Sequence, residues 1–484
     1  MRAPLIAAVV LSTMASAAGA DKPLQQDKAR MAALLKENLD WNRQTLGAEY
    51  ERAGKKDPRW DAAARQALDL AAQYFSQQTE PWVSPTQIYN AARKAVAAGC
   101  DDPMILYLYG RMSAGANYPG PAEYTRRMQA AADTLWSSRY SPIRRAVAMT
   151  FSYQVDPITA ASTPEARHKV EQILEAILDL LADSVAQDPK GFAWYRNWFD
   201  NLLAEIYGYE MLGMTYKAAY DRVDARLGKV VGIEPLRLLF KGNAYINWGW
   251  EARTTAFAPF VGDQQFRDLR SRLTVARAAL EQAWKLEHHL PRVAQLRIEV
   301  EKAIGDGDRA KMETWFERAM EANPNDYHAC WSKLDWLDPK WHGGDSFNEM
   351  MAFGRACKAS GNWVSGITLI GVDAYNRYSS RLPFEESREY LSSPVVWGDI
   401  RTVYEQYLKY YPDRYDERSK YAYLCYAAGY YDEANRQFKI LGDNLTTWEK
   451  YPNVPLAGLK QVRDAVAKGK NPRPKSDGPA EPDH

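Results

Sequence analysis

The sequence predicts an all-α fold built from helical hairpins, and three observations support this prediction. Apolar side chains recur at helical spacing in many segments, as Met312, Trp315 and Phe316 do within residues 305–326. Each of these segments is flanked by a turn rich in Gly and Asp or by a proline. Pro324 ends the helix within 305–326, because the residue before a proline is disfavoured in the helical conformation. No Gly/Ser-rich or Pro-rich linker interrupts the chain before residue 469, which favours one extended architecture over separate globules.

The first twenty residues have the features of a secretory signal peptide. Arg2 precedes an apolar run from Leu5 to Leu11, and the small residues up to Ala20 predict cleavage before Asp21. The run is too short to span a membrane, and no later stretch approaches the ~20 consecutive apolar residues that a span needs. We therefore expect an exported protein, periplasmic or extracellular, without a membrane span.

The charge balance argues against two classes of partner. The chain has 62 Lys and Arg against 61 Asp and Glu, and no basic block occurs. Nucleic acids and acidic membrane surfaces are bound through positive patches, so neither is expected as a partner.

The elements before residue 291 are predicted as helices without a fixed period. They are expected at residues 61–75, 104–112, 121–136, 143–154, 168–187, 192–209 and 273–286. Residues 21–290 therefore form a diverged helical-hairpin region, followed by a periodic part at 291–448. Residues 449–484 are predicted to form a C-terminal helix and a disordered tail, because the tail holds four prolines and almost nothing to bury.

In the periodic part the helix-ending prolines recur with a common spacing. Three residues each stand eight positions before a proline: Ala283 before Pro291, Phe316 before Pro324, and Tyr404 before Pro412. The 88 residues between Pro324 and Pro412 leave room for two hairpins with long loops, which we expect at 339–345 and 380–394.

The last unit resembles a tetratricopeptide repeat. Gly429 to Ala434 is similar to the inter-helix turn of that family, and Ala434 and Phe438 match its helix-B pattern of alanine, three residues, then an aromatic. The resemblance covers residues 291–448 and implies a superhelix of hairpins. Residues 305–357 also resemble an uncharacterised bacterial family of exported tetratricopeptide-like proteins, which implies no known activity.

The repeat resemblance implies a binding groove on the concave face, lined by helix A of each hairpin. The positions implied are Arg297, Glu301, His328, Trp331, Asp335, Asp338, Ser419, Tyr423 and Tyr426. They mix charge with aromatic rings, which suits an extended peptide because its backbone and side chains need donors, acceptors and flat apolar contacts together. The implied function is that of a binding or scaffold protein for a peptide, a protein or an envelope component, with no cofactor.

One loop is a second candidate for binding. Trp341, His342 and Asp345 lie in the 339–345 loop, and long insertions between helices of a solenoid project from one face and carry contacts. The alternative interpretation is structural, since a Gly-Gly turn with Asp345 before a helix is also an ordinary capping sequence.

No motif for catalysis or metal binding is found, although this leaves an enzyme open. Of six histidines only His288 and His289 are adjacent, and neighbours cannot share one helix face. The alternative function is a secreted all-α toroid acting on polysaccharide, with paired carboxylates in an aromatic cleft. Asp200, Glu205 and Glu251 lie near aromatic helices and are its candidates. Shape separates the two, since a toroid closes on itself and a solenoid stays open.

The four cysteines raise the question of a disulfide. Cys330 is expected near the start of one helix and Cys357 near the end of the next, so antiparallel packing would bring them to one level. A Cys330–Cys357 bridge is predicted, with two buried free thiols as the alternative. Cys100 and Cys425 are expected to stay free.

Overall fold

Helices follow one another throughout the computed structural model. The residues described are 28–76, 82–113, 117, 119–153, 163–187, 214–254, 260–288, 290–304, 307–344, 346–363, 365–447 and 454–469. Within them there is no strand, which confirms the all-α class. Of the helices described there, none is long and apolar enough to cross a lipid bilayer.

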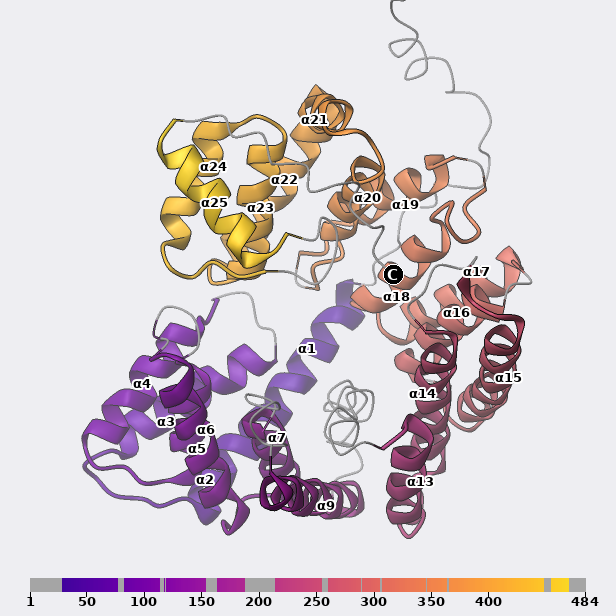
Figure 1. Cartoon of the computed structure of the whole chain (residues 1–484). Coiled ribbons are helices and arrows are strands. Elements are labelled where there is room, and N and C mark those ends of the chain that lie inside the picture. The colour runs from indigo at the N-terminus through magenta and orange to yellow at the C-terminus, as the bar shows by residue number, and fades with distance from the viewer. Residues whose placement is uncertain are drawn as a thin grey trace, which may run out of the picture.

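The helices fall into three consecutive stretches (Figure 1). The first contains α1 (Lys28–Arg43), the π-helical turn η1 (Gln44–Ala48), α2 (Glu49–Ala53), α3 (Asp61–Phe75), α4 (Pro85–Ala97), α5 (Pro103–Arg111), α6 (Pro121–Trp136), α7 (Pro142–Tyr153) and α9 (Pro164–Gln187). The second contains α13 (Tyr216–Leu227), α14 (Glu234–Arg253), α15 (Asp263–Leu286), α16 (Pro291–Ile304), α17 (Arg309–Ala322), α18 (Tyr327–Trp336) and α19 (Asn348–Ala359). The third contains α20 (Leu369–Ser379), α21 (Phe384–Ser392), α22 (Pro394–Tyr410), α23 (Tyr415–Ala427), α24 (Tyr431–Leu441) and α25 (Leu456–Ala467).

Most helices begin where local chemistry predicts. Pro is the first residue of α4, α5, α6 and α22, a position whose N–H has no partner within the helix. At α4 the Ser84 hydroxyl accepts from the Gln87 N–H at 3.2 Å while the Gln87 side chain accepts from the Ser84 N–H at 2.8 Å. α15 begins ten residues before the predicted helix at 273–286, and the predicted helix at 192–209 lies outside the described residues.

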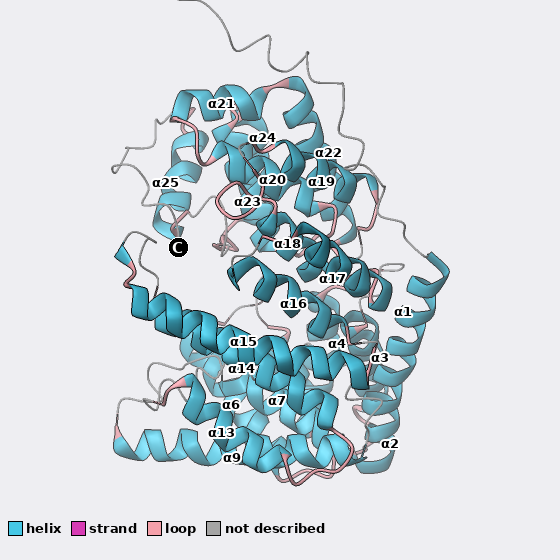
Figure 2. Cartoon of the chain, turned by 90° about the vertical axis from the view of Figure 1, so that its right-hand side faces the viewer, coloured by secondary structure: helices cyan, strands magenta, loops and turns pink. Residues whose placement is uncertain are grey.

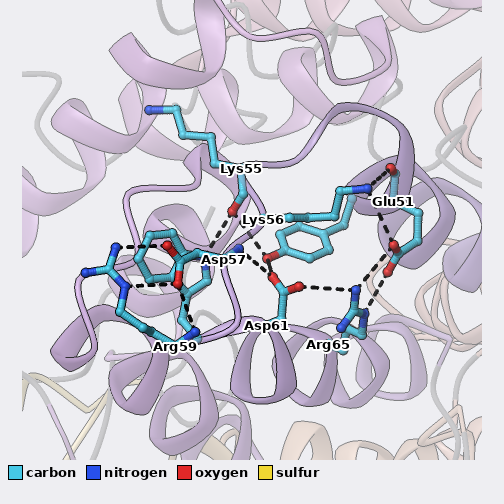
Figure 3. Close-up of polar contacts among 9 residues, drawn as sticks. Glu51, Lys55, Lys56, Asp57, Arg59, Asp61 and Arg65 are labelled. Atoms are coloured by element: carbon cyan, nitrogen blue, oxygen red, sulfur yellow. Dashed lines mark hydrogen bonds and ion pairs between the residues drawn. The ribbon is translucent and has the colours of Figure 1, made fainter.

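Side-chain hydrogen bonds add to the backbone ones in the turn between α2 and α3 (Figure 3). Asp61 accepts hydrogen bonds from the Tyr50 hydroxyl at 2.7 Å and from the Asp57 N–H at 3.0 Å. The Tyr50 bond lowers the pKa of Asp61. Arg65 reaches back to Glu51 at 2.7 Å, an exposed pair that contributes little to stability. These contacts stabilise the start of α3 and indicate a structural role for the turn.

One of the two predicted long loops is a helix. The segment predicted as a loop at 380–394 contains α21. Its Tyr390 ring lies 4.8 Å from the Tyr378 ring and 6.4 Å from the Tyr375 ring, and Leu391 is buried. These contacts with α20 stabilise a short helix that the local sequence pattern did not indicate. The 339–345 segment has no helix in its described residues, as predicted.

In the second stretch the helices form two layers. Each helix packs on the next, and α14 also packs on α16, α16 on α18, and α18 on α20. We call these four the inner helices. Figure 1 places α14 and α18 nearer the middle of the molecule than α15. Figure 2, which views the right-hand side of Figure 1, shows α15 in front of α14.

The hydrophobic core is a chain of overlapping clusters. A cluster under α13 and α14 includes Phe240 and Ala244, the next joins Leu239 to Val300, and a third joins Ile298 to Phe353. Neighbouring clusters share a helix: the first two both include residues of α14, and the second and third both include residues of α16. Such a core belongs to an array in which each hairpin is stabilised by its neighbours.

The two ends of the array meet. Trp82, in the connection before α4, packs edge-on against Tyr411 at the end of α22, with ring centroids 4.6 Å apart. Figure 1 shows both terminal stretches on the same side of the molecule, with α14 to α17 on the opposite side. The array therefore curves back onto itself.

Candidate functional site

Five charged side chains form a row across the inner helices, which we call the inner charged row. Lys302 from α16 pairs with Asp335 from α18, and Asp335 also accepts from Arg377 of α20 at 2.7 Å. Arg377 lies 3.6 Å from Asp338, which accepts from Arg381 at 2.7 Å. The row therefore joins three helices that are far apart in sequence.

Tryptophans cover two of the three cations of this row. The Arg377 guanidinium lies 4.4 Å from the centre of the Trp331 ring, and the Lys302 ammonium lies 4.9 Å from that of Trp341. Both tryptophans are only half-buried. Asp335 and Arg381 also reach the surface, with side chains 23% and 37% exposed. Aromatic faces and charged groups are thus presented together.

The pairing determines the ionisation of the row. Burial alone would raise the pKa of Asp335, but Lys302 and Arg377 outweigh burial and lower it. Burial alone would lower the pKa of Lys302, but Asp335 and Glu299 outweigh it and raise it. The Asp335 carboxylate and the Lys302 ammonium therefore both stay charged at neutral pH. The charged groups of the row can form hydrogen bonds with a ligand, and the tryptophan rings provide flat apolar surface. This arrangement suits binding rather than proton transfer.

A second buried pair extends this arrangement to α23. Lys420 donates to Asp373 at 2.6 Å, and the Tyr327 hydroxyl donates to the same carboxylate at 3.2 Å. Burial alone would lower the pKa of Lys420, but Asp373 outweighs it and raises it. Charged pairs therefore connect α16, α18, α20 and α23 in succession.

Several predicted groove residues are buried instead of exposed. Arg297 and Glu301 are 2% and 1% exposed and bond to each other at 2.5 Å. Glu281 pairs with Arg297 at 3.0 Å, and Arg277 pairs with Glu301 at 3.1 Å. This network connects α15 with α16, and its two buried members, Arg297 and Glu301, are out of reach of a ligand. The groove assignment of these two residues is therefore corrected to a structural one.

The groove residues predicted on α23 give a similar result. Ser419 and Tyr426 are buried, and the Ser419 hydroxyl accepts from the Thr446 N–H at 3.2 Å. Tyr423 is half-buried, with its ring 6.1 Å from that of Tyr426. Of the predicted groove, the residues with exposed surface are His328, Trp331, Asp335 and Tyr423.

The predicted loop contributes to the same place. Trp341 covers Lys302, and the His342 Nε2 lies 2.9 Å from the Lys302 carbonyl oxygen. The His342 ring also packs on Trp336 at 4.9 Å. Asp345 lies outside the described residues. The loop is therefore anchored to α16 and forms one edge of the inner charged row.

The predicted disulfide is not formed. Cys100, Cys330, Cys357 and Cys425 are all buried free thiols. Cys330 lies against Met320, with the two sulfurs 3.9 Å apart. Burial, together with contact with Cys357, raises the pKa of Cys330. Antiparallel packing does bring Cys330 and Cys357 together, but as thiols in the core.

The carboxylates proposed for an enzyme are not assembled by the described residues. Glu251 is exposed at the end of α14, while Asp200 and Glu205 lie outside the described residues. In the part of the chain that is described, no group of three or more His, Cys, Asp or Glu is arranged to hold a metal ion.

Sequence reasoning missed the cations of the inner charged row. Arg377 and Arg381 are four residues apart, and Asp335 and Asp338 three apart, so each pair could have been placed on one helix face. Which face meets which depends on packing between helices. Comparison with known proteins gives no further guide, since neither a protein-family model nor a curated protein matches the sequence.

Proposed function

We propose that this is an exported, tetratricopeptide-like binding or scaffold protein that recognises an extended peptide segment of a protein or envelope component through its inner helices. The export proposal rests on the signal-peptide features of residues 1–20. The repeat proposal is supported by the packing of α14, α16, α18 and α20 on one another with α15, α17 and α19 between them in sequence.

The observation that carries the binding proposal is the exposed part of the inner charged row. Trp331 and Trp341 present half-buried rings beside the surface-reaching charges Asp335 and Arg381. An extended peptide has backbone donors and acceptors at every residue, together with apolar side chains. Fixed charges and flat rings on one rigid surface match both needs.

The experiment captures partners with the immobilised mature protein from an extract of its own cell envelope. We expect retention of a protein or peptide, and loss of that retention in Trp331→Ala. Trp136→Ala is the matched control, because Trp136 is 38% exposed on α6, far from the inner helices in sequence. Equal retention by both variants would place the binding surface elsewhere.

A second candidate is a polysaccharide-acting toroid, and the meeting of the two ends of the array favours it. Contact between Trp82 and Tyr411 gives the closed outline expected of that class. Its test is release of reducing ends from envelope polysaccharides. We expect none, and a turnover that survives in Trp331→Ala would replace the binding proposal by this one.

A further inference from the structure

A hollow between α15 and α17 has the composition of a ligand site and lies outside the inner charged row. It has a volume of about 760 Å³. Small-molecule sites typically enclose roughly 300–1,000 Å³, so the hollow can take a ligand of one or two sugar rings. It lies on helices that the groove prediction did not use.

Two tryptophans form the apolar corner of this hollow. Trp284 from α15 and Trp315 from α17 meet edge to face, with ring centroids 5.8 Å apart and planes at 81°. Trp284 is half-buried, so part of its ring is open to a ligand. Such rings provide flat apolar area at a low entropic cost, since only two side-chain torsions are fixed.

An arginine without an acidic partner is held against this corner. The Arg318 guanidinium lies 4.4 Å from the centre of the Trp315 ring and 5.7 Å from that of Trp284. Among the described residues, Arg318 forms no ion pair or hydrogen bond. Stacking on the two rings thus orients the planar guanidinium of Arg318, whose N–H groups can bind a carboxylate through two parallel hydrogen bonds.

A buried arginine supports the corner from behind. Arg297 is 2% exposed, its guanidinium lies 4.9 Å from the Trp315 ring centre, and it donates to Glu281 at 3.0 Å. Its Nε and Nη1 have no hydrogen-bond partner within the described residues. Arg297 neutralises Glu281, so Arg318 and Lys285 outnumber the remaining acid, Glu321. The hollow therefore favours an anion.

We propose that the hollow between α15 and α17 binds an acidic sugar, a uronic acid unit of a polysaccharide. The Trp284 ring packs against the C–H face of the sugar, and Arg318 binds its carboxylate. Glu281 and Glu321 accept hydrogen bonds from its hydroxyls, which an aromatic carboxylate would not require. This inference goes beyond the proposed peptide binding and uses none of the same residues.

The test is calorimetric titration of the full chain with D-glucuronate, D-glucose and benzoate. We expect glucuronate to bind at least tenfold more tightly than either of the others. Equal binding of glucose would overturn the role of the carboxylate, and equal binding of benzoate would overturn the sugar assignment. No heat with glucuronate would overturn the site.

Two variants locate the binding. Arg318→Gln should weaken glucuronate at least tenfold, and Lys285→Gln, at an exposed position on the rim, should weaken it severalfold without affecting folding. Lys311→Gln is the control, because Lys311 is exposed on α17 outside the hollow and the charge change is the same. Unchanged binding in both hollow variants would overturn the proposal. Trp331→Ala should leave glucuronate binding unchanged, so failure here and failure of the peptide proposal are distinguishable.

Discussion

Asp335 shows how single side chains stabilise the inner helices. Its carboxylate contacts both Lys302 and Arg377, and both cations are almost fully buried. If this carboxylate were removed, Lys302 would still pair with Glu299 at 2.7 Å and Arg377 would lie 3.6 Å from Asp338, so both buried cations would lose part of their compensation. The effect of such a loss is large, because a buried charge cannot regain its hydration.

We expect Asp335→Asn to lower the free energy of unfolding by about 3 kcal/mol, the lower end of the range for a broken buried pair, because Asp335 is itself partly exposed. Urea unfolding measures this. Asp443→Asn is the control, at an exposed position on the loop after α24, and should change stability by less than about 0.5 kcal/mol. Similar values for the two variants would show that the row contributes little.

The same carboxylate predicts a pH dependence. Its pKa is lower in the folded protein than the ordinary value of about 3.9, so its contribution is complete above that value and is lost as pH falls toward the folded pKa. The difference in unfolding free energy between wild type and Asp335→Asn should therefore shrink below about pH 4. Other carboxylates titrate in both proteins and cancel in the difference. A constant difference down to pH 2.5 would contradict the pairing.

The cysteines give a chemical prediction at the same scale. Burial raises the pKa of Cys100 to about 11, and that of Cys330 and Cys425 is raised as well, so thiolate is scarce in the folded protein. A thiol reagent at pH 8 should react slowly with the native chain and with four thiols after unfolding without reductant. Two thiols after unfolding would restore the Cys330–Cys357 bridge.

At the scale of helices, close packing depends on small residues at a few positions. Gly242 of α14 faces α15 so closely that a Cβ there would lie 2.5 Å from the Leu280 side chain. Gly398 in α22 has nothing within 4 Å of the same built atom and is exposed. The two glycines therefore differ only in their surroundings.

We expect Gly242→Ala to destabilise the protein by about 1–3 kcal/mol, because the α14–α15 contact must open. Gly398→Ala should stabilise it by about 0.4–1 kcal/mol, because alanine restricts the unfolded chain and suits a helix. Thermal unfolding of both variants measures the difference in sign. A stabilising Gly242→Ala would mean that α15 can shift at no cost.

At the scale of the whole molecule, one aromatic contact closes the array. Trp82→Ala removes its ring from Tyr411 and from the C-terminal core cluster. The ends are then held by fewer contacts, so the radius of gyration from small-angle X-ray scattering should rise while helix content by circular dichroism stays the same. Trp136→Ala should leave the scattering unchanged. An unaltered profile for Trp82→Ala would mean that other contacts close the ring.

The sequence by itself determined the helical class and most helix ends. Periodicity and proline act within a few residues, so α3, α6 and the first residue of α22 follow from local chemistry. It also selected Trp331 and Asp335 as groove candidates through the repeat resemblance, and Trp341 as a separate candidate in the 339–345 loop.

Only the tertiary structure decided which of the candidate side chains are accessible. Lys302 and Arg377 are 33 and 42 residues from Asp335, and no local spacing reveals such pairs. Packing between α15 and α16 buries Arg297, which its local sequence does not indicate. The helix α21 likewise depends on its contacts with α20, and the contact of Trp82 with Tyr411 depends on the closure of the array. Each depends on the angles between helices, which accumulate along the array and have no signature in the residues of any one helix.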